Sequence, residues 1–261
     1  MKRSSRLPGA RRRALYGAAV LLAVSWSSWS SSSAAAEDGT GLLGVTTPAA
    51  ATAASARVGV LYREGGGHFC TASVVHSARH DVIATAAHCL DGDGAALLFA
   101  PGYRDGATPY GVWRVGRTYV ADAWKQSRDE DSDIAFAVVA EAGGDGGTGG
   151  RGVEDAVSGG NALATGRVTG AAEVTLTGYP KSLDTPVTCT NRPTVHSAGQ
   201  QRVACPDFPG GTSGSPWVNG DGEIVGVIGG HEQGGDTADV SYSVVLGDAV
   251  ARLYQDAVRA G

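Results

Sequence analysis

Short runs of apolar and β-branched residues recur along this chain, and Gly, Asp and Pro separate most of them. Runs of this length bounded by turn residues are typical of β-strands. They form two groups of about six, on either side of a Gly-rich tract at residues 143–152. The pattern predicts an all-β protein with strands at residues 57–62, 69–75, 82–85, 96–100, 110–120, 133–139, 173–179, 185–189, 201–205, 215–219, 223–229 and 240–245.

The end of the chain has a different period. Val250, Leu253, Tyr254 and Ala257 recur at the spacing of one helix face, and Asp248 stands where a helix N-cap belongs. We therefore expect a C-terminal helix after the second group of strands. Strands do not alternate with helices elsewhere, which argues against a parallel α/β sheet.

The N-terminus has the organisation of an export signal. Six Lys or Arg residues lie between positions 2 and 13, and an apolar run follows at residues 14–24. Three alanines stand at residues 34–36. The run is short for a membrane span, so we interpret residues 1–36 as a signal peptide rather than as an anchor. The arginines at 11–13 fit both the general and the twin-arginine export routes. We interpret residues 37–56 as a leader or pro-segment, with ordered structure beginning near Arg57.

Charge and cysteine content limit the function and the environment of the exported chain. Removal of residues 1–36 takes away six of the 21 basic residues and none of the 26 acidic ones, which leaves a net charge of about −11. Such a chain is a poor candidate for binding nucleic acid. Its four cysteines predict disulfides, for which three pairings exist. Proximity in sequence favours the pairs Cys70–Cys89 and Cys189–Cys205. The sequence has no C-x-x-C motif, so a structural zinc site is not expected.

Three motifs carry residues suited to acyl transfer. The sequence T-A-A-H-C at residues 85–89 follows a predicted strand and contains His88. Asp133 precedes the apolar run 134–139, where a carboxylate needs a partner such as an imidazole. Ser213 lies in P-G-G-T-S-G-S-P at residues 209–216, where Gly allows a sharp turn. A Ser nucleophile, a His base and an orienting Asp form the set required for nucleophilic catalysis.

These motifs, in the order His, Asp, Ser, resemble those of the chymotrypsin-like (trypsin-like) serine peptidases, particularly of a bacterial secreted branch. The α/β-hydrolases, a hydrolase class with another fold, have the order Ser, Asp, His. The resemblance implies two six-stranded antiparallel β-barrels with the active site between them. It also implies the pairing Cys70–Cys89 and an oxyanion hole formed by the backbone N–H groups of Gly211 and Ser213.

The predicted domains follow from this resemblance. The N-terminal barrel covers residues 57–142, a Gly-rich connection covers 143–160, and the C-terminal barrel with its helix covers 161–261. We expect a secreted, extracellular monomer that acts on protein or peptide substrates. It would need no cofactor or metal, and would not associate stably with a membrane after signal cleavage.

The sequence identifies the specificity residues less clearly than the triad. Thr212 stands where trypsin has an Asp, so activation by a salt bridge to a new N-terminus is not expected. Asp207 lies six positions before Ser213, where an Asp would favour Arg or Lys at P1; the alternative is a solvated loop residue. The predicted pocket wall comprises Ile228, Gly229, Gly230 and His231.

Two other functions remain open at this point. Residues 226–228 read G-V-I where glutamyl endopeptidases have G-I-H, which leaves a Glu-preferring endopeptidase as one alternative. The other is a catalytically silent binding protein of the same fold, against which the complete triad argues.

Overall fold

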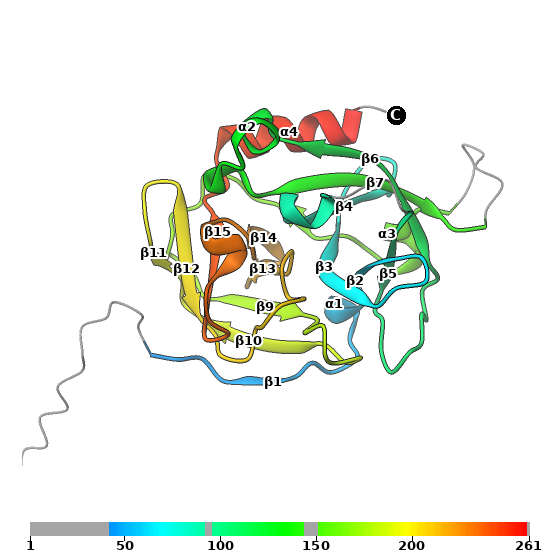
Figure 1. The fold of residues 1–261 in the computed structure, drawn as a ribbon, viewed down its shortest axis with the longest axis horizontal. Coiled ribbons are helices and arrows are strands. Elements are labelled where there is room, and N and C mark those ends of the chain that lie inside the picture. The colour runs from blue at the N-terminus through cyan, green and yellow to red at the C-terminus, as the bar shows by residue number, and fades with distance from the viewer. Residues whose placement is uncertain (1–41, 92–95, 144–150, 260–261) are drawn as a thin grey trace, which may run out of the picture. The chain divides into compact units, whose positions relative to one another are not determined.

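The computed structural model describes residues 42–91, 96–143 and 151–259 (Figure 1). The predicted signal peptide at residues 1–36 lies outside the described residues. Within those residues, no helix has the length and apolar character needed to cross a membrane. The described part is mostly β-structure, and the predicted fold class is confirmed.

Six strands of the N-terminal half close into a barrel (Figure 1). All six were predicted from the sequence, and β4 has the predicted bounds. Their order around the barrel is β2-β3-β4-β7-β6-β5, with antiparallel pairing throughout. The strands are β2 (Val58–Arg63), β3 (His68–Val75), β4 (Val82–Thr85), β5 (Leu97–Pro101), β6 (Trp113–Val120) and β7 (Ala135–Glu141).

The barrel interior is apolar and tightly closed to solvent. Leu61, Val74, Ile83, Phe99 and Trp113 pack there and are almost completely buried. Burial of each such side chain contributes about 1.5–3 kcal/mol relative to exposure. The first disulfide, Cys70–Cys89, belongs to the same core and links β3 to the segment after β4. The second disulfide, Cys189–Cys205, also forms, so both predicted pairings are confirmed.

The C-terminal half is built from two sheets. One has the order β1-β10-β9-β13-β14-β8 and the other has the order β11-β12-β15. The pairing of β14 with β8 is parallel, unlike the antiparallel pairing expected throughout. The strands are β1 (Thr46–Pro48), β8 (Ala162–Leu163), β9 (Val174–Gly178), β10 (Val187–Asn191), β11 (Thr194–Val195), β12 (Gln200–Ala204), β13 (Pro216–Asn219), β14 (Glu223–Val227) and β15 (Val240–Val244).

Ordered structure begins earlier than Arg57, the start expected from the sequence. Strand β1 pairs with β10 in the C-terminal half, and helix α1 (Ala53–Ala56) leads directly into β2 (Figure 1). The side chain of Thr52 caps α1 by accepting the Ser55 N–H at 3.2 Å. The Ala/Thr-rich composition concealed these elements because a three-residue strand is recognisable only by its partner.

The Gly-rich connection also contains structure. Residues 144–150 lie outside the described residues, but α3 (Val153–Ala156) follows them. Val153, Ala156 and Val157 are buried in the barrel core. Their spacing places three apolar side chains on one helical face, which explains why this part of the predicted connection is ordered.

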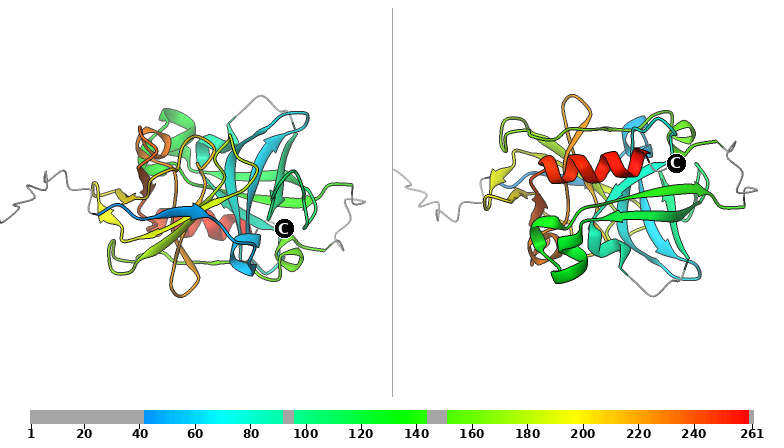
Figure 2. Two further views of the ribbon diagram at one scale, coloured as in Figure 1. Left: turned by 90° about the horizontal axis from the view of Figure 1, so that it is seen from below. Right: turned by 90° about the horizontal axis from the view of Figure 1, so that it is seen from above.

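The predicted C-terminal helix is confirmed as α4 (Asp248–Arg259), and the helix begins at Asp248. It lies along β6 and β7, as Figure 2 shows from above. Its apolar side chains join a core that includes Phe136 of β7 and Ile224 of β14. The helix therefore packs on strands from both halves.

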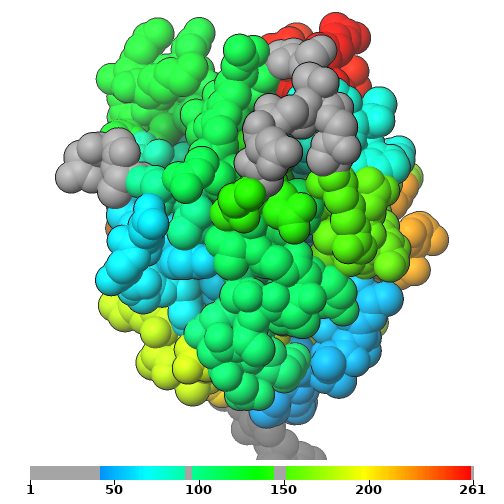
Figure 3. Space-filling model, turned by 90° about the vertical axis from the view of Figure 1, so that its right-hand side faces the viewer, coloured from blue at the N-terminus to red at the C-terminus, as the bar shows by residue number. Residues whose placement is uncertain are grey.

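The loop between β5 and β6 contacts two further segments on the barrel face shown in Figure 3. The Arg104 guanidinium donates to the Ala49 carbonyl at 2.6 Å, and the Asp105 N–H donates to the Asp184 carbonyl at 2.9 Å. This loop thus ties the N-terminal segment and the C-terminal half to the barrel.

Candidate active site

His88 and Asp133 form a tightly bonded pair. His88 lies in the turn η1 (Ala87–Leu90) after β4, and Asp133 ends the turn η2 (Glu130–Ser132) before β7. The His88 Nδ1 and an Asp133 carboxylate oxygen are 2.7 Å apart, and the other carboxylate oxygen accepts the His88 backbone N–H at 2.9 Å. Because a carboxylate only accepts, Nδ1 carries the proton and a neutral ring leaves Nε2 as an acceptor.

The surroundings hold this pair in one orientation. Asp133 is 1% exposed and accepts a third hydrogen bond, at 2.9 Å, from the backbone N–H of Gly230. A buried carboxylate is stable only when its oxygens are satisfied in this way. Trp124 of α2 (Asp122–Ser127) stands near the imidazole, with 6.4 Å between ring centroids. These contacts restrict the ring to a position in which Nε2 can accept a proton.

Ser213 lies in a Gly-rich loop before β13. Gly211 and Gly214 on either side have φ values of +104° and +85°, which residues other than Gly rarely adopt. An ideal Cβ on Gly214 would lie 2.0 Å from the Thr71 carbonyl oxygen. The loop therefore needs Gly both for its turns and for its close approach to β3.

The Ser213 segment lies beside the His88 segment. The Thr71 N–H on β3 donates to the Ser213 carbonyl at 2.7 Å, and Thr71 follows Cys70. Cys70 is bonded to Cys89, the residue after His88. On the other side, the Gly214 N–H donates to the Ile228 carbonyl at 2.7 Å, just before Gly229 and the Asp133 partner Gly230.

The Ser213 hydroxyl points toward another acceptor in this structure. It contacts the carbonyl of Gln233 at 3.5 Å, in the turn η3 (His231–Gly234). Glu232 and Gln233 in that turn both have positive φ, an uncommon conformation for these residues. In the described part of the chain, no hydrogen bond joins the Ser213 hydroxyl to the His88 ring.

The expected oxyanion donors, the N–H groups of Gly211 and Ser213, have no hydrogen-bond acceptor in the described part of the chain. By contrast, the Thr212 N–H and hydroxyl both bond to the Pro209 carbonyl, at 3.1 and 2.7 Å. The Thr212 side chain thus closes its own loop, whereas the two flanking N–H groups have no acceptor in the described part of the chain.

The predicted specificity residues have different environments. Asp207 is exposed and adopts φ +61°. Its neighbour Phe208 is buried, with its N–H bonded to the Ala238 carbonyl at 2.9 Å. Ile228 is also buried and packs in the same core as Phe208.

The rest of the predicted pocket wall is engaged in structural contacts. Gly230 donates to Asp133, and an ideal Cβ on Gly229 would lie 2.7 Å from the Asp133 carbonyl oxygen. The His231 N–H donates to the Gln200 side chain at 2.8 Å. The His231 ring packs 4.9 Å from that of His196, and the His196 pKa is lowered by burial and by this neighbour.

Two groups of described side chains have metal-ligand geometry. Cys70, His88 and Cys89 form the first, but the two cysteines share a disulfide and cannot act as thiolate ligands. Glu130, His231 and Glu232 form the second, with ligand atoms within 4.8 Å of one another at a solvent-accessible position.

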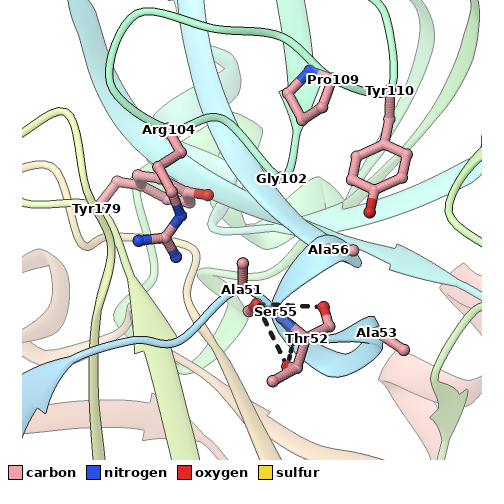
Figure 4. Close-up of a pocket in the computed structure, with 10 residues that line it drawn as sticks. All are labelled: Ala51, Thr52, Ala53, Ser55, Ala56, Gly102, Arg104, Pro109, Tyr110 and Tyr179. Carbon is pink, nitrogen blue, oxygen red and sulfur yellow. Dashed lines mark hydrogen bonds between the residues drawn. The ribbon is translucent and has the colours of Figure 1, made fainter.

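Sequence reasoning missed Thr71 and did not assign a role to Tyr179. The Tyr179 N–H donates to the Thr71 hydroxyl at 2.9 Å, and its own hydroxyl donates to the Tyr103 carbonyl at 2.8 Å. Burial raises the pKa of Tyr179, which keeps this donor protonated. Its ring lines a pocket of about 410 Å³ beside Arg104 and α1 (Figure 4). The G-Y-P motif at residues 178–180 was the available signal.

Comparison with known proteins gives an independent assignment. Residues 70–227 match the family described as trypsin-like peptidase domain. No curated protein matches the chain by sequence.

Solved structures of bacterial proteases are similar to the chain. The protease Anisep from Arthrobacter nicotinovorans is 25% identical with a TM-score of 0.68, over 82% of this chain and 99% of that one. The thermostable serine protease AL20 from an extremophilic microorganism is 27% identical with a TM-score of 0.68, over 80% and 100%. A Glu endopeptidase shares the fold at 17% identity and a TM-score of 0.66, over 84% and 98%.

Proposed function

This chain belongs to the trypsin-like peptidase family, and on that premise we propose that it is a serine endopeptidase with His88, Asp133 and Ser213 as its triad. Ser213 attacks the scissile carbonyl while His88 Nε2 takes the hydroxyl proton. Asp133 holds the imidazole tautomer and stabilises the imidazolium that forms. His88 then protonates the leaving amine, and water releases the acyl group.

The observation that carries this proposal is the buried His88–Asp133 pair. A carboxylate that is 1% exposed and bonded to Nδ1 leaves Nε2 as the basic nitrogen of the ring. The Ser213 carbonyl is anchored to the strand whose disulfide reaches Cys89, next to His88. The N–H groups of Gly211 and Ser213 supply the oxyanion hole, where one donor contributes about 3 kcal/mol to transition-state stabilisation.

Labelling with a fluorophosphonate tests the nucleophile directly. We expect one equivalent of label on the peptide that contains Ser213, and none on Ser213→Ala. The control is Ser182→Ala, because Ser182 is an exposed serine in a neighbouring loop. Absence of label on the folded wild-type protein, together with no peptide hydrolysis, would support the alternative of a catalytically silent binding protein.

We propose Arg or Lys at P1 on the basis of Asp207, whose carboxylate would attract a basic side chain. Cleavage of a peptide library by wild type and by Asp207→Ser tests this. The matched control is Asp221→Ser, another exposed acidic residue. Loss of the basic preference only in Asp207→Ser supports the assignment. An unchanged profile removes it, and a profile restricted to Glu would instead favour the Glu-preferring alternative.

We also propose that residues 1–36 are removed during export and that the mature protein is extracellular and monomeric. Two disulfides favour an oxidising compartment. N-terminal sequencing of protein from the culture medium should begin at Glu37 or later. A start beyond Pro48 would identify residues 37–48 as a pro-segment, whose loss must break the pairing of β1 with β10.

A further inference from the structure

Thr71 occupies the junction between the His88 and Ser213 segments. It lies on β3 and is 0% exposed. Its backbone N–H donates to the Ser213 carbonyl at 2.7 Å, and its hydroxyl donates to the Gly211 carbonyl at 3.0 Å. A single residue of the barrel thus holds the nucleophile loop at two points.

The same hydroxyl is also an acceptor. The Tyr179 N–H donates to it at 2.9 Å from the end of β9. Because a hydroxyl has one donor and two acceptor positions, both interactions can form at once. The Thr71 side chain therefore holds the nucleophile loop and the Tyr179 segment in one fixed relation.

This relation bears on the proposed oxyanion donor. The Lys181 N–H, two residues after Tyr179, donates to the Gly210 carbonyl at 2.9 Å. The Gly210 carbonyl belongs to the same peptide plane as the Gly211 N–H, so this bond fixes the direction of that donor. The Thr71 hydroxyl fixes the next peptide plane through the Gly211 carbonyl. Both planes around Gly211 are thus anchored.

Thr71 is connected to the base as well. Its carbonyl accepts the Thr85 hydroxyl at 2.8 Å, and Thr85 opens the T-A-A-H-C motif that contains His88. Thr85 is also 0% exposed. Two buried threonines on adjacent strands therefore form a relay of hydrogen bonds from the His88 segment to the Ser213 loop, in addition to the Cys70–Cys89 disulfide.

We propose that Thr71 is a positioning residue whose hydroxyl sets the orientation of the Gly211–Ser213 loop relative to His88, an inference that rests on the proposed serine-peptidase function. Without the hydroxyl, the Gly211 carbonyl and the Tyr179 N–H lose a buried partner, and the loop shifts to find others. A misplacement of about 1 Å at a catalytic group lowers the rate by roughly a hundredfold.

The test compares Thr71→Val with Thr71→Ser. Valine keeps the shape and removes the hydroxyl, whereas serine restores the hydroxyl. We expect Thr71→Val to lower kcat about 10–100-fold and to slow fluorophosphonate labelling by the same factor, with KM changed less than about threefold. Thr71→Ser should recover kcat to within about threefold, and the pH profile should keep its wild-type apparent pKa because the His88–Asp133 pair is intact.

Thr188→Val is the matched control. The Thr188 hydroxyl on β10 donates to the Leu176 carbonyl at 2.8 Å and accepts from the Thr177 hydroxyl at 3.3 Å, and among the described residues it has no hydrogen bond to the nucleophile loop. All variants are assayed well below their measured Tm, so that a loss of stability does not appear as a loss of rate. If Thr71→Val does not fold, Thr71→Ala replaces it with the same expected result.

The inference is overturned if the hydroxyl-free variant keeps kcat within twofold of wild type. A loss no greater than that of Thr188→Val, or no recovery in Thr71→Ser, also overturns it. Ser213→Ala separates this from the wider proposal: full activity in Ser213→Ala contradicts the proposed function, whereas an inactive Ser213→Ala beside a fully active Thr71→Val contradicts only the role of Thr71.

Discussion

The two sides of the candidate active site are held in different ways. On the base side, the Asp133 side chain accepts three hydrogen bonds and fixes the His88 ring directly. On the nucleophile side, the Ser213 loop is anchored to β3 and to the segment after β14 through its backbone groups, and the Ser213 hydroxyl has one hydrogen bond in the described part of the chain, to the Gln233 carbonyl at 3.5 Å. The proposed base is thus held through side-chain hydrogen bonds, while the proposed nucleophile is held through its main chain.

The difference agrees with the roles proposed for the two groups. A base works in one tautomer and one orientation, so burial and side-chain bonds favour it. A nucleophile must approach the substrate and later release it, which requires a side chain that rotates on a fixed backbone. Substitutions on the base side should therefore act on the rate, and backbone changes on the nucleophile side should act on stability as well.

The largest effect is expected for Asp133→Asn. An amide at this position cannot hold the Nδ1 proton in the same way and favours the wrong tautomer, so kcat should fall by about 10⁴. Steady-state kinetics with a peptide substrate measure the change. A loss of less than tenfold would mean that the pair does not prepare His88 for catalysis.

The two disulfides should contribute equally to the stability of the fold but unequally to kcat. Replacing either pair with alanines should lower the free energy of unfolding by about 3 kcal/mol, since the loops have similar lengths, with sequence separations of 19 and 16. Only loss of Cys70–Cys89 should also lower kcat, because that bond joins β3 to the His88 segment. Urea unfolding and kinetics on both variants check this, and equal kcat values would contradict it.

Gly214→Ala tests the backbone on the nucleophile side. The new Cβ would lie 2.0 Å from the Thr71 carbonyl oxygen, and the φ of +85° is unfavourable for alanine. We expect a loss of at least about 2 kcal/mol in the free energy of unfolding. Gly220→Ala is the control, because its Cβ would meet no atom within 4 Å. Equal stability of the two variants would show that the loop is less constrained than its geometry implies.

The smallest effect is expected far from the site, at the exposed pair His80–Asp155. Their hydrogen bond raises the pKa of His80 and lowers that of Asp155. The His80 contribution to stability is complete below its ordinary pKa of 6.5 and disappears as the pH rises through its folded-state pKa. The Asp155 contribution is complete above its ordinary pKa of 3.8 and disappears as the pH falls through its folded-state pKa.

The pair should therefore stabilise the fold most between about pH 3.8 and 6.5. A titration of His80 by NMR, and the difference in urea midpoint between wild type and His80→Ala across this range, measure it. A difference that does not change with pH would contradict the linkage. A pH profile of kcat that differs between His80→Ala and wild type would contradict the independence of this pair from the candidate active site.

The local sequence pattern was sufficient to predict much of the secondary structure and both disulfides of this protein. Strand β4 has its predicted bounds because its four residues are all apolar or β-branched. The predicted C-terminal helix formed as α4, in which Asp248, the expected N-cap, is the first helical residue. The two disulfides followed from an even number of cysteines and short separations. The three motifs identified the residues that the structure brings into neighbouring segments, although the sequence gives no distance between them.

The chain by itself therefore determined most of its strands, its C-terminal helix and the residue types of the candidate site, since these depend on neighbours in sequence. The short strands β1, β8 and β11 were not predicted. Only the tertiary structure decided that β1 pairs with β10, that Gly230 donates to Asp133 and that Thr71 joins both sides of the site. Each of these contacts links segments far apart in the chain, and such contacts are selected by the packing of the whole domain. A lone Thr or Gly has no local pattern that distinguishes such a role from that of an ordinary core or turn residue.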